Sequence, residues 1–285
     1  MSSIKTGTSA RYAARDSTIT TPTSGIAPGY VQANLVVLPS HYANDFRLLC
    51  LRNPVALPLL AEGTHDRLKS HVANLEHDEI INTTPGFDLR RDVPKYTIFR
   101  DAKLSQDDLN EVKEDDWTKD HVVFVLGSSF TFDSALSGAG LASRSPNPPL
   151  YVATKKLLFP SGNFYDSPFV VSMRPYSAGE IGKVREATAP FVAAHGEPID
   201  WGWGAVERLG IADINSPEWG DAPLTKDGKP FGDAAWTSED VPVFWGSAVT
   251  AQEAVKKAEL EGTVIVNKPG YMLLLDCQMV DVRRK

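Results

Sequence analysis

Apolar runs alternate with polar, turn-forming stretches along most of this chain. Runs of β-branched and apolar residues between turn formers predict strands over 29–39, 95–101, 122–126, 150–156, 169–175, 241–249, 263–268 and 271–279. Helical spacing and capping signals predict helices over 40–54, 177–192 and 250–260, and the charged run at 105–117 is typical of a solvated helix face. Several strands are apolar throughout, as in strands covered on both faces. We therefore expect an α/β fold with a mixed, largely parallel sheet and helices on both faces.

A proline-rich break indicates how the chain is divided. The segment RSPNPP, at residues 144–149, carries three prolines and interrupts the alternation of strands and helices. We expect it to begin a smaller α+β domain over 144–204. The main α/β domain then comprises 26–143 and 205–285, and residues 1–25 form a flexible tail with a short helix.

Composition and charge narrow the class of partner. The 285 residues carry a net charge of -7, which argues against nucleic-acid binding, and no apolar run reaches the roughly 20 residues that span a bilayer.

The two cysteines, Cys50 and Cys277, imply no disulfide framework, so we expect a cytoplasmic protein. Basic residues near the N-terminus leave mitochondrial targeting as the alternative. Nucleotide-binding glycine motifs and zinc-type Cys/His sets are missing, so we expect neither a cofactor nor a metal.

Three segments share one plan, in which an apolar strand runs into a small polar loop and then a helix start. They are VVFVLGSSFTFDSAL, FVVSMRPYSAGE and VPVFWGSAVTAQE. In an open α/β sheet, ligands bind beyond the carboxyl ends of the strands, and helix N-termini present N–H groups that suit an anion. If the three strands are parallel neighbours, Ser128, Arg174 and Ser247 line one cavity. Arg174 then supplies the charge that binds a carboxylate.

Each candidate in these segments also has a purely structural interpretation. Ser128 and Ser129 could be turn formers, Arg174 part of a structural ion pair, Asp133 a helix cap, and His195 an ordinary loop residue. The stretch GSSFT lacks the second glycine of the G-x-S-x-G motif, so it gives little support to a serine hydrolase.

Nine short stretches give the chain a specific resemblance to the D-glutamate cyclase-like family of hydro-lyases. They are PTSGIAPGYVQANLVVLP, CLRNPVALPLL, DLRRDVPKYTIFRD, FVLGSSFTFDSAL, VVSMRP, HGEPI, GDAP, VPVFWGSAVTAQ and KPGYM. The resemblance covers nearly the whole chain, from about residue 11 to residue 276. It implies a two-part α/β and α+β fold, no cofactor, and a dehydrating ring closure that converts D-glutamate to 5-oxo-D-proline and water.

The resemblance also implies which residues act on the substrate. The catalytic candidates are Ser128, Asp133, Asp92 and His195. Arg174 and the loop N–H groups suit the α-carboxylate and the oxyanion of the tetrahedral intermediate. The other substrate-binding candidates are Ser129, Ser247, Tyr30, Gln32, Asn34, Asn267 and Tyr271. Among these, Tyr30, Gln32 and Asn34 alternate along one predicted strand, so we expect them to face the pocket together.

The sequence departs from the usual pattern of that family at four of these positions. Ser128 stands where the family usually has Cys, Asp133 where it has Glu, and Asn267 and Tyr271 where two histidines flank the last Pro-Gly. Two alternatives stay open: a diverged lyase or cyclase that acts on another carboxylate in specialised biosynthesis, and a non-catalytic protein that binds small carboxylates. The expected partner is a small carboxylate or amino acid, with no nucleic acid and no membrane. A homodimer is an open alternative to a monomer.

Overall fold

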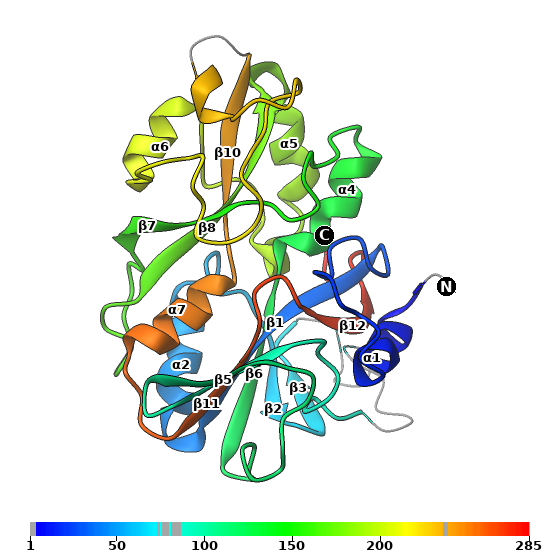
Figure 1. The fold of residues 1–285 in the computed structure, drawn as a ribbon, viewed down its shortest axis with the longest axis vertical. Coiled ribbons are helices and arrows are strands. Elements are labelled where there is room, and N and C mark those ends of the chain that lie inside the picture. Colours follow the sequence, from blue (N-terminus) through cyan, green and yellow to red (C-terminus); the bar gives the residue numbers. More distant parts are fainter. Residues whose placement is uncertain (1–3, 73–74, 76–79, 81–86, 236–238, 285) are drawn as a thin grey trace.

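The protein consists of two β-sheets with helices packed on them. The computed structural model describes residues 4–72, 75, 80, 87–235 and 239–284. Figure 1 shows the smaller sheet above the larger one. Helices α2 (Ser40–Arg52) and α7 (Val249–Lys257) lie beside the larger sheet at the left, and α1 (Gly7–Arg15) lies beside strand β12 (Leu273–Gln278) at the right.

The larger sheet is built around β1, which pairs with strands that lie far away in the sequence. Its strand order is β3-β2-β6-β1-β11-β4-β5, and β12 also pairs with β1. The strands are β1 (Tyr30–Pro39), β2 (Leu59–Thr64), β3 (Arg67–Ser70), β4 (Tyr96–Arg100), β5 (Lys103–Leu109), β6 (His121–Gly127), β11 (Thr263–Asn267) and β12. In the register, Ala33 lies opposite Gly127 and Val36 opposite Val266.

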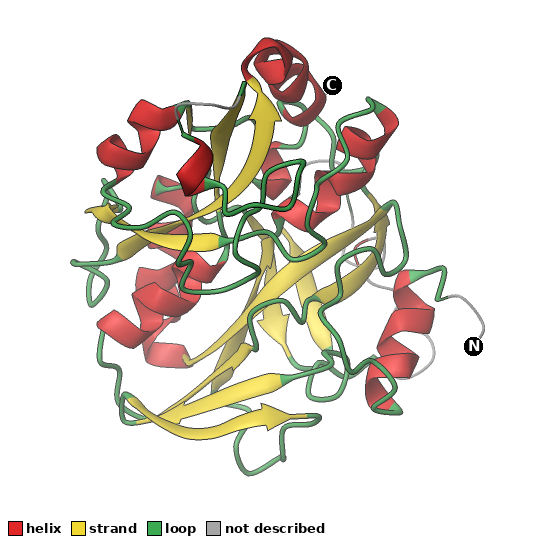
Figure 2. Cartoon of the chain, turned by 45° about the horizontal axis from the view of Figure 1, so that its top comes forward, coloured by secondary structure: helices red, strands yellow, loops and turns green. Residues whose placement is uncertain are grey.

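The smaller sheet carries a helical layer on each face. Its order is β7-β8-β10-β9, with β7 (Leu150–Lys156), β8 (Pro168–Ser177), β9 (Asp200–Trp201) and β10 (Asp240–Gly246). Helices α4 (Asp133–Gly138) and α5 (Ile181–Thr188) contribute to the core on one face, and α6 (Trp203–Leu209) contributes to the core on the other. Figure 2 shows these helices around the strands.

The prediction of an α/β chain is confirmed, but the prediction of a largely parallel sheet is wrong, because every strand pair in the two sheets is antiparallel. The reason lies in β1, which is covered on both faces. Leu35 and Val37 contribute to one core, while Val36 and Leu38 pack against α2 and α7 in another. A strand buried on both faces looks the same in sequence whether its neighbours are parallel or antiparallel.

The prediction of a helix over the charged run at 105–117 is wrong, because the run begins within strand β5. Asp101 and Ala102 both have a positive φ, at 49° and 63°. Two such residues form the tight turn that closes a β-hairpin, here between β4 and β5. The exposed polar side chains of β5 reflect its position at the edge of the sheet.

The two sheets meet where α7 packs against β8. Thr250 in α7 accepts a hydrogen bond from the backbone N–H of Val170 in β8, at 3.0 Å. Strand β10 lies in the smaller sheet, although its residues fall within the range expected for the main domain. The expected domain boundaries otherwise stay a prediction.

Candidate active site

Arg174 on β8 is a buried cation whose hydrogen bonds are only partly satisfied. Its side chain is 1% exposed, and its guanidinium carbon lies 5.2 Å from the ring centre of Phe132 and 5.3 Å from that of Trp245. Nη2 donates to Oδ1 of Asp133 at 2.8 Å and lies 3.5 Å from Oγ of Ser129. Nε and Nη1 find no hydrogen-bond partner among the described protein atoms. We call these two unpartnered donors the free edge of Arg174; they point to different sides of the planar guanidinium, so each offers a single hydrogen bond.

The alternation of β8 explains which groups surround Arg174. Ser172 lies two residues before Arg174 and therefore shares its face of the strand; it pairs with Trp245 of β10. Oγ of Ser172 is also buried without a described partner. Arg174 lies inside β8, which continues to Ser177, in agreement with the strand predicted over 169–175. The prediction that a polar loop follows the strand at Arg174 is wrong.

Asp133 is the counter-ion of Arg174, and it does not cap α4. The cap position belongs to Phe132, and Asp133 lies in the first turn with its carboxylate turned to the guanidinium. Burial raises the pKa of this carboxyl above its ordinary value, and the neighbouring Arg174 counteracts part of that rise. The side chain stays 25% exposed, so Asp133 connects the buried cation with the surface.

Ser128 and Ser129 have different surroundings although they are neighbours. Oγ of Ser128 accepts a hydrogen bond from the N–H of Phe130 at 3.4 Å and so caps the short helix Ser129–Phe132. The N–H of Ser128 donates to the carbonyl of Gln32 in β1. Ser128 therefore anchors the loop, as the structural interpretation expected, while Ser129 lies beside Arg174.

His195 lies between the ends of strands from both sheets. A Cβ on Gly127, the last residue of β6, would lie 1.7 Å from the carbonyl oxygen of Ala193, and a Cβ on Gly246, the last residue of β10, would lie 3.1 Å from Nδ1 of His195. Glycine at both strand ends leaves room for this segment. Burial lowers the pKa of His195 to about 4, and the charge of Arg174 also lowers it. The imidazole is therefore neutral at pH 7. We call Arg174, Ser129, Asp133, Ser172 and His195 the Arg174 cluster.

Ser247 makes its described hydrogen bonds with backbone groups around the start of α7. Its N–H donates to the carbonyl of Val170, and its Oγ accepts from the N–H of Val249 at 3.4 Å. Three parallel neighbouring strands do not exist here, because β6 belongs to the larger sheet and β8 pairs antiparallel with β10. That Ser128, Arg174 and Ser247 line one cavity stays a prediction.

Three buried amides form a second polar group, which we call the amide cluster: Asn34, Gln252 and Asn267. Nδ2 of Asn267 donates to Oδ1 of Asn34 at 3.2 Å, and Nε2 of Gln252 donates to the carbonyl of Asn267 at 2.8 Å. Oδ1 of Asn267 accepts from the N–H of Leu35 at 2.8 Å. The side chain of Asn267 is fully buried, and its polar atoms have partners within the protein.

Tyr30, Gln32 and Asn34 alternate on β1, but their contacts lie in three different places. Gln32 binds the loop at residues 23–26 through both of its amide atoms. Tyr30 packs against a small core formed by Ala10, Ala27 and Leu274. Tyr271 donates from its hydroxyl to the carbonyl of Thr20. These contacts give no support to the expectation that the three β1 side chains face one pocket.

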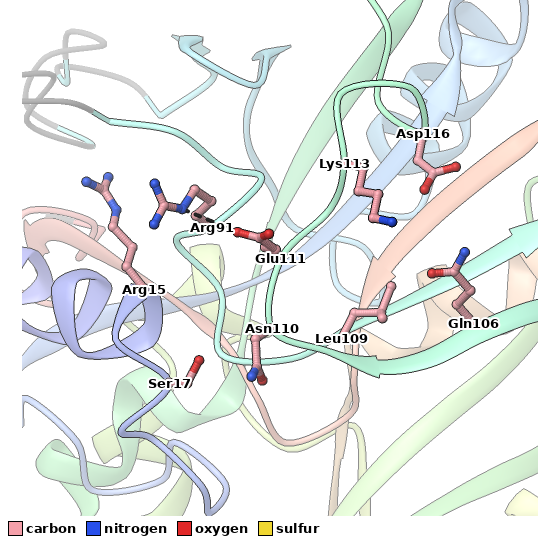
Figure 3. Close-up of a pocket in the computed structure, with 9 residues that line it drawn as sticks. All are labelled: Arg15, Ser17, Arg91, Gln106, Leu109, Asn110, Glu111, Lys113 and Asp116. Carbon is pink, nitrogen blue, oxygen red and sulfur yellow. Dashed lines mark ion pairs between the residues drawn. The ribbon is translucent and has the colours of Figure 1, made fainter.

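Asp92 belongs to a different part of the molecule. It accepts hydrogen bonds from Nε of Arg15 at 2.6 Å and from the N–H of Asp88 at 2.9 Å. Burial raises its pKa, and Arg15 counteracts this rise. Arg15 also lines a cavity of about 360 Å³ with Arg91 and Lys113 (Figure 3), whose lining includes no member of the Arg174 cluster. The described contacts of Asp92 thus place it beside this cavity, away from the Arg174 cluster.

Sequence reasoning missed Ser172, Phe132, Trp245 and Gln252. The signal for Ser172 was present, since a polar residue two positions before Arg174 in a strand must share its face. Within the described part of the chain, no three His, Cys, Asp or Glu side chains gather where a metal could bind. No described helix has the length and apolar character needed to cross a membrane.

Several known proteins match this chain in sequence over most of its length. The sequence profile named D-glutamate cyclase matches residues 122–276, which is more than half of the chain. Three relatives share the name "Putative hydro-lyase". The one from Schizosaccharomyces pombe is 35% identical, covering 94% of this chain and 83% of its own. Those from Rubrobacter xylanophilus and Dinoroseobacter shibae are each 38% identical, covering 90% and 89% of this chain and 89% and 88% of their own. The chain therefore belongs to the D-glutamate cyclase family.

Proposed function

We propose that this protein is a hydro-lyase that closes a small amino-dicarboxylate into a lactam, with D-glutamate to 5-oxo-D-proline as the reference reaction. The observation that carries the proposal is the free edge of Arg174, a buried charged group with donors that no described protein atom accepts. Leaving such donors unpaired is costly, and a carboxylate oxygen would accept a charge-assisted hydrogen bond from either of them. Membership of the family supports the reaction class.

The reaction forms one C–N bond and breaks one C–O bond. The amine nitrogen attacks the carbon of the distal carboxyl group. Two protons leave the nitrogen as the ammonium becomes a lactam N–H, and the departing oxygen takes up both to become water. Because both reacting groups belong to one molecule, positioning them supplies much of the rate. The site must hold the other carboxylate and move the protons.

Arg174 and Asp133 suit these two tasks. The free edge of Arg174 binds the carboxylate that does not react, and Asp133 then lies beside it, since its Oδ1 is 2.8 Å from Nη2. A carboxyl whose pKa is raised by burial holds its proton closer to neutral pH, so it is the better donor to the departing oxygen. His195, with a pKa of about 4, is a weak base for taking a proton from an ammonium group.

The test compares two arginines that each contact a carboxylate and an aromatic ring. Arg174→Ala removes the buried one, and Arg185→Ala removes an exposed one that pairs with Glu197 and covers Trp201. We expect Arg174→Ala to raise the Kd for a carboxylate ligand at least about thirtyfold, and Arg185→Ala to leave it unchanged. Formation of 5-oxoproline is followed by mass spectrometry. Equal affinity and turnover in wild type and Arg174→Ala, with the fold intact by circular dichroism, would contradict the proposal.

One observation favours a second candidate, a lyase of the same family acting on another carboxylate. Asn267 stands where the family usually has His, and its side chain is fully engaged in the amide cluster. The polar atoms at this position are therefore not available to a substrate. A screen of amino and hydroxy diacids for loss or gain of water separates the candidates. Turnover of a different diacid favours the second, and binding without turnover favours a non-catalytic carboxylate binder.

A further inference from the structure

The backbone of His195 adopts a conformation that few non-glycine residues tolerate. Its φ is 81°, in the left-handed region, and the next residue, Gly196, has a φ of 70°. The surrounding structure must hold this conformation, and the glycines at the ends of β6 and β10 provide the space. The position of the imidazole is therefore fixed by strands of both sheets.

The hydrogen bond to Val55 places the proton of His195, and the backbone of Gly127 also lies close to the ring. Nδ1 lies 2.8 Å from the carbonyl oxygen of Val55, which can only accept. Nδ1 therefore carries the proton of the neutral ring. Nε2, on the other side of the ring, keeps a lone pair, and it is buried without a described protein partner. A buried acceptor without a donor is unfavourable, and a donor from a ligand would satisfy it.

The charges in the Arg174 cluster indicate what kind of ligand fits. Asp133 already pairs with Arg174, and the free edge offers a cationic site for one carboxylate. The other unpartnered atoms, Nε2 of His195 and Oγ of Ser172, are neutral. An open-chain amino-dicarboxylate brings three charged groups into this site, whereas a ring acid such as 5-oxoproline brings one carboxylate and a neutral N–H. A second cation close to Arg174 is disfavoured in a buried site.

We propose that His195 is a specificity-determining residue: its Nε2 accepts a hydrogen bond from a neutral N–H or O–H group of a ligand whose carboxylate is bound by Arg174. The inference rests on the proposed function for the carboxylate, and it adds that the site selects the lactam form. The left-handed backbone, the bond to Val55 and the unpartnered Nε2 all serve this arrangement.

The experiment compares two ring acids that differ in a single group. The first is 5-oxo-D-proline, and the second is 3-oxocyclopentane-1-carboxylate, which has CH₂ in place of the ring N–H. Their Kd values are measured by calorimetry on the full-length wild type and on His195→Asn. Asparagine tolerates the left-handed backbone and keeps an N–H near the position of Nδ1, but it has no atom at the position of Nε2.

We expect the wild type to bind the lactam about 10–100-fold more tightly than the carbocycle, and His195→Asn to bind the two equally. Equal affinities in the wild type would overturn the role of His195 while leaving the carboxylate site intact. A preference that persists in His195→Asn would overturn the assignment to this residue. If neither ring acid binds the wild type, the carboxylate site of the proposed function fails, and this inference fails with it. Where the variant does not fold, equal affinities in the wild type still overturn the inference.

Discussion

The Arg174 cluster and the amide cluster are both buried polar groups, but their hydrogen bonds are satisfied to different extents. In the amide cluster, Asn34, Gln252 and Asn267 bind one another and the backbone. In the Arg174 cluster, four polar atoms on Arg174, Ser172 and His195 have no described partner. Saturated buried amides stabilise one arrangement of the chain, whereas unsatisfied buried groups are retained at a cost. The comparison separates a structural polar group from a binding site.

The largest expected effect is on catalysis, from Asp133→Asn. The amide can still accept from Arg174 but cannot give up an acidic proton, so kcat should fall about 10²–10⁴-fold with little change in KM. In the wild type, kcat should decrease as pH rises through the raised pKa of Asp133, since the protonated form is the donor. Steady-state kinetics against pH checks both statements. Asp200→Asn, in an exposed pair with Arg208, is the control, and an equal loss there would rule out a specific role for Asp133.

The second effect concerns the pH dependence of stability through His195. Its pKa is about 4 in the folded protein against 6.5 for an ordinary histidine, so the unfolded chain binds the proton more readily between these values. The free energy of unfolding should therefore rise by about 3 kcal/mol from pH 4 to pH 6.5 on account of this group, and His195→Asn should lack this part. Urea denaturation of both proteins across that range isolates the contribution. Parallel curves would show that the buried ring is not held neutral.

The third effect tests whether the amide cluster is structural. Asn267→Leu leaves Oδ1 of Asn34 and the N–H of Leu35 without their partner, and the free energy of unfolding should fall by about 2 kcal/mol. Asn44→Leu, on the exposed side of α2, should change it by less than about 0.5 kcal/mol. Chemical denaturation provides the measurement. A stable Asn267→Leu protein that has lost ligand binding would reverse the roles assigned to the two clusters.

The smallest effect is expected when the same measurement is made on the double variant Arg174→Met/Asp133→Leu. Replacing both members of the pair by apolar side chains leaves no uncompensated charge, so the free energy of unfolding should change by less than about 1 kcal/mol. A loss of 3 kcal/mol or more would instead indicate that the pair between Arg174 and Asp133 holds the fold together. In that case the structural interpretation of Arg174 would be the better one.

The sequence predicted the strands of the core better than their arrangement. The apolar runs that became β1, β6, β8 and β11 lie close to their observed bounds, because a strand buried on both faces must be apolar along its length. Parallel and antiparallel strands that are buried on both faces have the same apolar pattern, so the antiparallel pairing could not be inferred from the sequence. The charged run of β5 was misassigned, because its structure depends on a tight turn at Asp101 and Ala102 and on an edge position.

For the candidate site, sequence reasoning selected residues but not their contacts. Arg174, Asp133 and Ser129 were each singled out, and the structure brings them together. Asp92 was selected for its chemistry alone, and its partner Arg15 lies 77 positions away in the sequence. Similarly, local patterns could not show that Asn267 and Asn34, separated by 233 positions, satisfy one another. Long-range partners decide whether a polar residue is available to a ligand.

The central place of β1 also has a consequence for biosynthesis. β1 leaves the ribosome long before β11 and β12, the downstream strands with which it pairs. Val36, for example, pairs with Val266, which is synthesised much later. Until then, one hydrogen-bonding edge of an apolar strand stays open, and such an edge is prone to aggregation. The larger sheet should therefore close late and fold slowly, as expected for a sheet that depends on distant pairings.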